Sequence, residues 1–130
     1  MEEEIVFQAI GRIKTKYKKR FGTPSQGSEA KKSRGVILLK EQYLEGAKDF
    51  RVGDKITVVF CFHQSKGYKL TIIPYRSVVP TGVFSTRSPD RPNSVGITVV
   101  TLTKVEGNRI EFEGADMLDG TPIIDLKPAI

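Results

Sequence analysis

The sequence predicts an all-β protein with a minor helical part, built as a small single-domain barrel of about seven short strands. Short runs of β-branched and aromatic residues recur along the 130 residues, separated by turn-forming Gly, Pro, Asn and Asp. Only residues 41–50 show helical spacing, and no repeat or linker composition divides the chain. We therefore expect residues 1–130 to form one domain whose strands close, or nearly close, into a barrel.

The first half of the chain contributes four of the expected strands. Apolar runs, alternating or continuous, predict them at 5–14, 35–40, 56–63 and 68–73. ITVVFCFH at 56–63 is the strongest of these runs. Residues 41–50 predict one or two helical turns, because Tyr43, Leu44 and Ala47 recur at helical spacing.

The second half reads as a strand-like run, a hairpin and a closing strand. GVFST at 82–86 precedes a charged loop, 95–105 and 109–114 pair through the turn EGN, and PIIDL at 122–126 closes the chain. Alternation then places four polar loops at one end of the barrel: 15–34, 63–67, 86–94 and 114–122. Any binding site is expected there, because loops on a rigid scaffold carry most functional residues.

Composition excludes several kinds of chemistry. The single Cys61 leaves no internal disulfide and is consistent with a reducing, cytoplasmic location, and the acidic N-terminus is unlike a signal peptide. No apolar run approaches the ~20 residues of a membrane helix. One Cys and one His, His63, provide no zinc site of the ordinary ligand set. His63 itself ends an apolar strand and is either a structural residue or a catalyst.

Positive charge is concentrated near the N-terminus of a chain whose net charge is +6. Nine basic residues and one acidic residue lie between Arg12 and Arg34. This density is typical of a surface that binds a polyanion, and Tyr17 and Phe21 offer rings for base stacking. A solvated basic loop explains the same composition, so both interpretations stay open.

Two other loops hold the residue types of a binding site. In TRSPDRPNS, residues 86–94, Pro89 and Pro92 restrict the backbone around Arg91, and guanidinium groups bind carboxylates or phosphates in bidentate fashion. A rigid turn with exposed arginines is the alternative. DMLDGTPIID, residues 116–125, is an acidic loop in a basic protein. It suits a small cationic ligand, or it is an ordinary Asp-Gly turn.

Four motifs, taken together, resemble those of the TrmO (TsaA-like) family. They are FGTPSQG (21–27), FCFHQ (60–64), GVFSTRSPDRPNSVGIT (82–98) and DMLDGTPIIDLKP (116–128). They follow the family's order with similar spacing and span almost the whole chain. Several positions depart from the family pattern: Ser25 replaces the usual Arg, Tyr75 stands where Pro is common, TKYKK lacks a proline before its tyrosine, and KPAI stands where many members read KPY.

The resemblance implies a homodimeric β-barrel methyltransferase that uses S-adenosyl-L-methionine. Its substrate would be the N6 amine of threonylcarbamoyl-adenosine, next to the anticodon in the anticodon loop of certain tRNAs. Such a transfer requires no metal and no covalent nucleophile, because the cofactor carries the reactive methyl group. The cofactor site implied by the resemblance comprises Pro24, Ser25, Gln26, His63, Gln64, Arg87, Ile97, Leu118, Asp119, Gly120, Thr121 and Pro122.

Roles within that implied site follow from side-chain chemistry. We expect Asp119 first, and His63 second, to accept the proton that leaves the adenine amine. Arg87 is expected to hold the methionyl carboxylate, and Phe62 or Phe84 to flank the sulfonium. The expected RNA contacts are Lys16, Lys18, Lys19, Arg20, Arg91 and Asn93.

Two other functions stay open from the sequence. One is a nucleic-acid-binding barrel without catalytic activity, for which the acidic LDGTP loop would have no purpose. The other keeps the cofactor site but methylates a small molecule or a protein.

Overall fold

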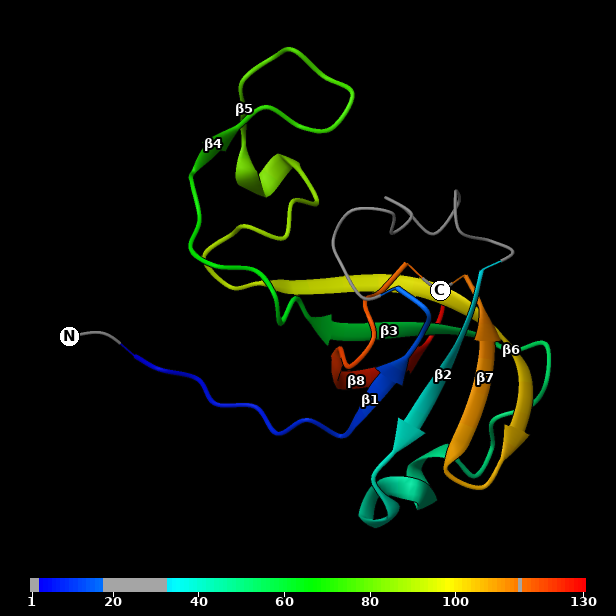
Figure 1. Ribbon diagram of the computed structural model, residues 1–130. Helices are drawn as coiled ribbons and strands as arrows, with labels where there is room; N and C mark the ends of the chain where they lie inside the picture. The colour runs from blue at the N-terminus through cyan, green and yellow to red at the C-terminus, as the bar shows by residue number, and fades with distance from the viewer. Residues whose placement is uncertain (1–2, 18–32, 115) are drawn as a thin grey trace.

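The computed structural model describes residues 3–17, 33–114 and 116–130, and its main element is a closed barrel of antiparallel strands (Figure 1). Within these residues, six strands pair in the circular order β1-β2-β7-β6-β3-β8. Their bounds are Gly11–Lys14 (β1), Arg34–Leu39 (β2), Lys55–Cys61 (β3), Val95–Glu106 (β6), Arg109–Glu113 (β7) and Pro122–Pro128 (β8). The circle closes because β8 pairs with β3 on one side and with β1 on the other. The mostly-β fold class is confirmed.

The hydrophobic core fills the barrel through alternate residues of each strand. On β3, Ile56, Val58 and Phe60 are buried, and on β6 Val100 and Leu102 are buried in the same alternating phase. Burial of one such side chain stabilises the fold by roughly 1.5–3 kcal/mol. The period of two that predicted these strands is therefore the pattern that forms the core.

The predicted hairpin and helical turns are both present. β6 and β7 are joined through Gly107 and Asn108, and Gly107 has a φ of 59°, a conformation that glycine adopts without steric cost. The stretch 41–50 contains a 3₁₀ helix, η1 (Glu41–Ala47), whose Ala47 packs against the core. No helix in the described part of the chain is long and apolar enough to span a membrane.

The predicted first strand is wrong at its N-terminal end. β1 begins at Gly11 rather than at residue 5, and Ile5, Val6 and Phe7 are 64–75% exposed. An alternating run forms a strand only where a neighbouring strand accepts its hydrogen bonds. Ile10 still donates its N–H to the carbonyl of Ile123, but within the described part of the chain no strand of the ring pairs with residues 5–9.

Residues 63–94 form an arm that projects from the barrel between β3 and β6 (Figure 1). The predicted strand 68–73 shrinks to β4 (Thr71–Ile72), because its partner β5 (Thr81–Gly82) is equally short. The strand-like run 82–86 is likewise corrected, since η2 (Val83–Ser85) is a 3₁₀ turn with Val83 buried. Eight strands thus occur in the described residues where about seven were expected.

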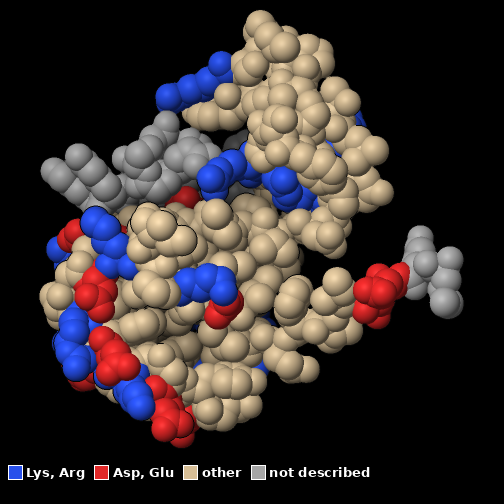
Figure 2. All heavy atoms as spheres, turned by 180° about the vertical axis from the view of Figure 1, so that it is seen from behind, with Lys and Arg blue, Asp and Glu red and all other residues tan. Residues whose placement is uncertain are grey.

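The arm carries many exposed apolar side chains together with positive charge. Its large exposed apolar residues are Tyr68, Leu70, Ile73, Tyr75, Val78, Val79 and Phe84. It also contains five basic residues and one acidic residue. Figure 2 shows Lys and Arg side chains where the arm approaches the barrel. Large exposed apolar patches are typical of interaction surfaces.

Candidate functional site

The 116–121 loop crosses one end of the barrel and is fastened to the end of β1. Asp119 Oδ1 accepts the backbone N–H of Thr15 at 3.0 Å, and the Asp119 N–H donates to the Tyr17 carbonyl at 2.6 Å. The Thr15 hydroxyl donates to the carbonyl of Met117 at 3.0 Å, and the Met117 side chain is buried in the core. The loop is consequently held both by hydrogen bonds and by an apolar anchor.

The same loop reaches the end of β3 through its last residues. Gly120 has a φ of 83°, which turns the chain back toward β8. The buried Thr121 hydroxyl donates to the Leu118 carbonyl at 2.6 Å, and the same oxygen lies 3.5 Å from Nδ1 of His63. His63 and residues 118–121, which the resemblance placed in one site, therefore lie together.

The carboxyl group of Asp116 is largely removed from water. Its Oδ2 accepts the Thr98 hydroxyl at 3.3 Å, whereas its Oδ1 is buried with no hydrogen-bond partner among the described residues. Burial raises the pKa of Asp116 from 3.8 to about 6, because the charged form loses its hydration. The hydrogen bond from Thr98 and the positive charge of Arg87 lower the pKa and offset part of this rise. Arg87 belongs to the arm, so its charge links the 86–94 loop to the 116–121 loop.

The 86–94 loop is braced by its own hydrogen bonds. Nη1 of Arg91 donates to the carbonyls of Thr86 and Ser88 at 2.9 and 3.2 Å. The Ser65 hydroxyl bonds to the Pro89 carbonyl and to Oδ1 of Asp90, at 2.9 and 2.7 Å. The rigidity predicted from the two prolines thus has a second source, and one nitrogen of Arg91 is already used inside the loop.

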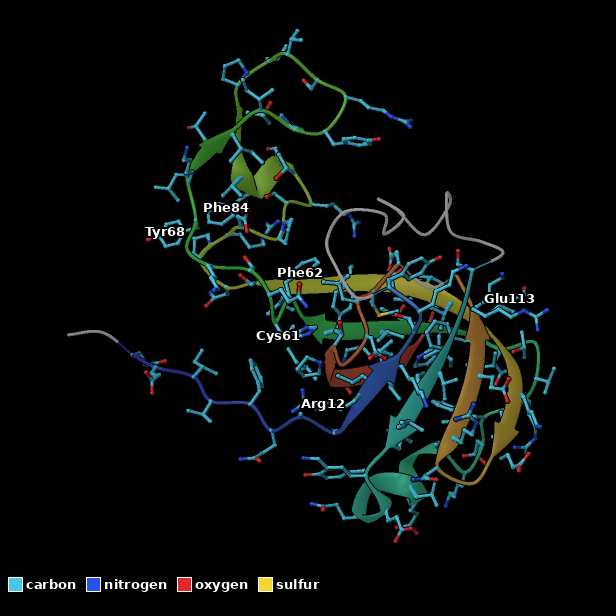
Figure 3. All side chains as sticks on the ribbon, viewed as in Figure 1. Arg12, Cys61, Phe62, Tyr68, Phe84 and Glu113 are labelled. Carbon is cyan, nitrogen blue, oxygen red and sulfur yellow. The ribbon has the colours of Figure 1, made fainter. Side chains whose placement is uncertain are left out.

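Aromatic side chains lie where the arm leaves the barrel. The Phe62 N–H donates to the Ser94 carbonyl at 2.8 Å, and its ring meets that of Phe60 edge to face, with the ring centres 5.0 Å apart. Gly96 allows this arrangement, because a Cβ there would lie 2.6–2.8 Å from atoms of both rings. Figure 3 shows Phe62 at the end of the barrel and Phe84 on the arm, where Phe84 is 77% exposed.

The structure gathers part of the predicted site. Ile97 lies on the outer face of β6 and is half exposed, and Lys16 lies over the Tyr17 ring with its Nζ 5.7 Å from the ring centre. Asn93 is exposed at the end of the arm loop. Six predicted residues lie outside the described residues: Lys18, Lys19, Arg20, Pro24, Ser25 and Gln26. Their predicted roles are therefore not tested.

Two threonines of the site were not predicted as site residues. Thr98 and Thr15 are both buried, and each bonds to the 116–121 loop. Thr98 is in the same phase of β6 as Val100 and Leu102. A polar residue in the buried phase of a strand is a detectable signal, because buried hydroxyl groups require a hydrogen-bond partner.

This end of the barrel combines two carboxylates, an imidazole, a guanidinium group and an aromatic ring on loops that are held in place. Such a set can bind a polar ligand that carries both charges and can accept a proton from it. Among the described residues, no group of three or more His, Cys, Asp or Glu side chains is placed to hold a metal ion.

The chain is similar to known proteins over nearly its whole length. Residues 12–130 match the family described as the tRNA-methyltransferase O N-terminal domain. A probable S-adenosyl-L-methionine-binding protein of Pyrococcus abyssi is 37% identical over 126 residues, which cover 97% of this chain and 68% of that protein. The tRNA (adenine(37)-N6)-methyltransferase of Mus musculus is 37% identical over 136 residues, covering 97% of this chain and 31% of the mouse enzyme.

Solved structures agree with these matches. The crystal structure of TrmO from Pseudomonas aeruginosa superposes with a TM-score of 0.80 at 31% identity, covering 98% of this chain and 57% of that chain. This chain therefore spans about a third of the mouse enzyme and somewhat over half of the Pseudomonas protein.

Proposed function

The chain belongs to the family of tRNA-methyltransferase O N-terminal domains, and from this premise we propose that it transfers a methyl group from S-adenosyl-L-methionine to N6 of an adenine in tRNA. The target predicted from the sequence is threonylcarbamoyl-adenosine beside the anticodon. The observation that carries the proposal is the convergence of three of the four family motifs, since Arg87 acts on Asp116 and the LDGT segment lies against His63.

The described residues fit the proposed cofactor by their chemistry. S-adenosyl-L-methionine, when bound, supplies a methyl group activated by a positive sulfur. Arg87 provides a cation for its carboxylate, while the buried, unpaired oxygen of Asp116 is suited to a hydrogen-donating group of the second reactant. His63, Gln64, the backbone at Ile97, and residues 118–122 complete the described part of the predicted cofactor site, with 24–26 beyond it.

We propose that the protein binds and aligns the cofactor and the adenine and excludes water from them. Asp119 and His63 remain the proton acceptors predicted from the sequence. Asp119 also fastens the loop to β1 through the N–H of Thr15. The cofactor loop is thereby preorganised, which reduces the entropy lost on binding.

We further propose that the basic residues of the arm bind the tRNA backbone together with the basic segment 12–34. Apart from Arg87, which is assigned to the cofactor carboxylate, these arm residues are Lys66, Lys69, Arg76 and Arg91. An anticodon loop presents unpaired bases, so the target adenine is accessible without opening a duplex. Affinity for tRNA should fall steeply as salt rises, by about 0.7 in log K per log salt for each single-strand phosphate contact. Lys66→Glu with Lys69→Glu should flatten that slope, and an unchanged slope would remove these lysines from the interface.

The exposed apolar surface supports a homodimer. Val95, Ile97 and Val99 lie on the outer face of β6 and are 37–50% exposed, and the arm beside them is also apolar. A second copy related by two-fold symmetry would cover both surfaces at once. We expect light scattering to give twice the chain mass, and Ile97→Lys to give the monomer. Lys104→Glu, at the charged end of the same strand, is the control and should leave the dimer intact.

The deciding experiment is incubation with unmodified and modified tRNA plus the cofactor, followed by mass spectrometry of the anticodon-loop nucleosides. A gain of one methyl group on the adenine beside the anticodon is the expected result. Cofactor binding with no change in any tRNA would favour a small-molecule or protein substrate. Calorimetry that detects no cofactor binding at millimolar concentration would favour the nucleic-acid-binding barrel instead. We expect the reaction in the cytoplasm, where it would meet tRNA.

A further inference from the structure

We propose that Asp116, rather than Asp119, accepts the proton that leaves the adenine N6 nitrogen. This inference rests on the proposed function and adds the identity of the base. In the part of the chain that the structure describes, one buried side-chain polar atom has no hydrogen-bond partner, and it is Oδ1 of Asp116. An unpaired buried acceptor costs roughly 1–3 kcal/mol. Such groups persist where a ligand completes the hydrogen bond.

The carboxyl group of Asp116 is held from two sides. The Thr98 hydroxyl of β6 donates to Oδ2 at 3.3 Å, and the next residue, Met117, is buried in the barrel core. Thr98 therefore fixes Oδ2. Oδ1 has no partner among the described residues and can accept a hydrogen bond from a bound substrate. A base held in this way needs little reorganisation when it takes a proton.

Asp119 holds the 116–121 loop against the residues that follow β1. Its Oδ1 accepts the backbone N–H of Thr15 at 3.0 Å, and its own N–H bonds to the Tyr17 carbonyl at 2.6 Å. This carboxyl oxygen is therefore already occupied by a backbone N–H that holds the loop. We assign Asp119 to positioning the loop. His63 is exposed, and its Nδ1 contacts the Thr121 hydroxyl.

The charged surroundings of Asp116 agree with the role of a base. Arg87, from the 86–94 loop, is the charged group that acts on it, and Thr98, from β6, is neutral. With its pKa raised to about 6 by burial, Asp116 is mostly ionised at pH 7–8 and remains a stronger base than an ordinary aspartate.

The proposed step balances as follows. The N6 nitrogen forms a bond to the methyl carbon while the carbon–sulfur bond breaks and its electron pair stays on sulfur. The N6–H bond also breaks, its electron pair stays on nitrogen, and the proton passes to Oδ1 of Asp116. Solvent then removes that proton and regenerates the carboxylate.

The test compares wild type, Asp116→Asn and Asp119→Asn in single-turnover methylation of tRNA from pH 5 to 9. The wild-type rate should rise with pH, along an acid limb, and then level off. In Asp116→Asn this acid limb should disappear, and the methylation rate should fall by about 10²- to 10⁴-fold, the usual contribution of a general base. Cofactor affinity by calorimetry should stay within threefold in Asp116→Asn. Asp119→Asn should instead keep the acid limb and weaken cofactor binding.

A readout independent of activity is the carboxyl ¹³C titration of Asp116 in the free protein, which should show a midpoint near 6. If Asp116→Asn does not fold, Asp116→Glu serves in its place and should move the acid limb. An Asp116→Asn rate within threefold of wild type, a lost cofactor affinity, or an unmoved limb in Asp116→Glu would each overturn the assignment. A wild-type protein that methylates no tRNA would refute the proposed function itself, and with it this role.

Discussion

Replacing Asp116 with Asn should make the protein more stable at neutral pH, even though it removes a site residue. Burial raises the pKa of this carboxyl group in the folded state, so the folded protein binds its proton more tightly than the unfolded chain does. As pH rises from 3.8 through about 6, the unfolded state releases the proton first. The wild-type protein therefore loses stability between these pH values, whereas the Asp116→Asn variant does not, because Asn does not titrate.

The size of the effect follows from the two pKa values. The difference between 3.8 and about 6, at 1.36 kcal/mol per pKa unit, amounts to about 3 kcal/mol above pH 7. Most of this change falls between pH 4 and pH 7, because the difference grows as pH rises from 3.8 through about 6. Because water reaches part of this carboxyl group, we take this value as an upper estimate. Any change in the hydrogen bond to Thr98 adds a constant to the difference in unfolding free energy, and this constant does not vary with pH.

The assay is urea unfolding of wild type and Asp116→Asn at half-unit steps from pH 4 to pH 8. The difference in the free energy of unfolding should grow in favour of Asn and level off above pH 7. Asp49→Asn, at an exposed carboxyl group outside the site, controls for the chemical change itself. A difference that stays constant across the whole range would refute the claim that burial raises the pKa of Asp116.

Three further predictions concern the scaffold of the site. Gly96→Ala should destabilise the protein by about 1–3 kcal/mol in urea unfolding, because its Cβ meets two phenylalanine rings, whereas Gly46→Ala, where nothing lies within 4 Å, should not destabilise it. Thr121→Val removes the hydroxyl that holds the Leu118 carbonyl and should weaken cofactor binding about fivefold in calorimetry, for a loss of about 1 kcal/mol. Arg91→Ala should raise hydrogen exchange of the 86–94 loop, and unchanged protection would mean that its bonds to that loop are dispensable.

Much of the barrel was predictable because each long strand buries one face. The runs in β3, β6 and β7 show the period of two that the core imposes, and their predicted bounds lie within two residues of the observed ones. β1 and β4 were predicted too long, because an apolar run does not reveal where its pairing partner ends. Residues 5–7 satisfy the pattern of a strand but are exposed and, among the described residues, lie outside every strand.

The sequence by itself determined the alternation that builds the barrel and the motifs that identify the family, since both depend on residues close together in the chain. From the sequence we name Asp119, and not Asp116, as the first proton acceptor, because the sequence alone does not show which acid of DMLDG is buried. Tertiary structure separated them: Asp119 meets the N–H of Thr15, a residue 104 positions away, while Asp116 is buried beside Thr98. Pairing of β8 with β1 closes the ring and brings Asp119 beside Thr15, and the residues near either one in the sequence do not reveal this pairing.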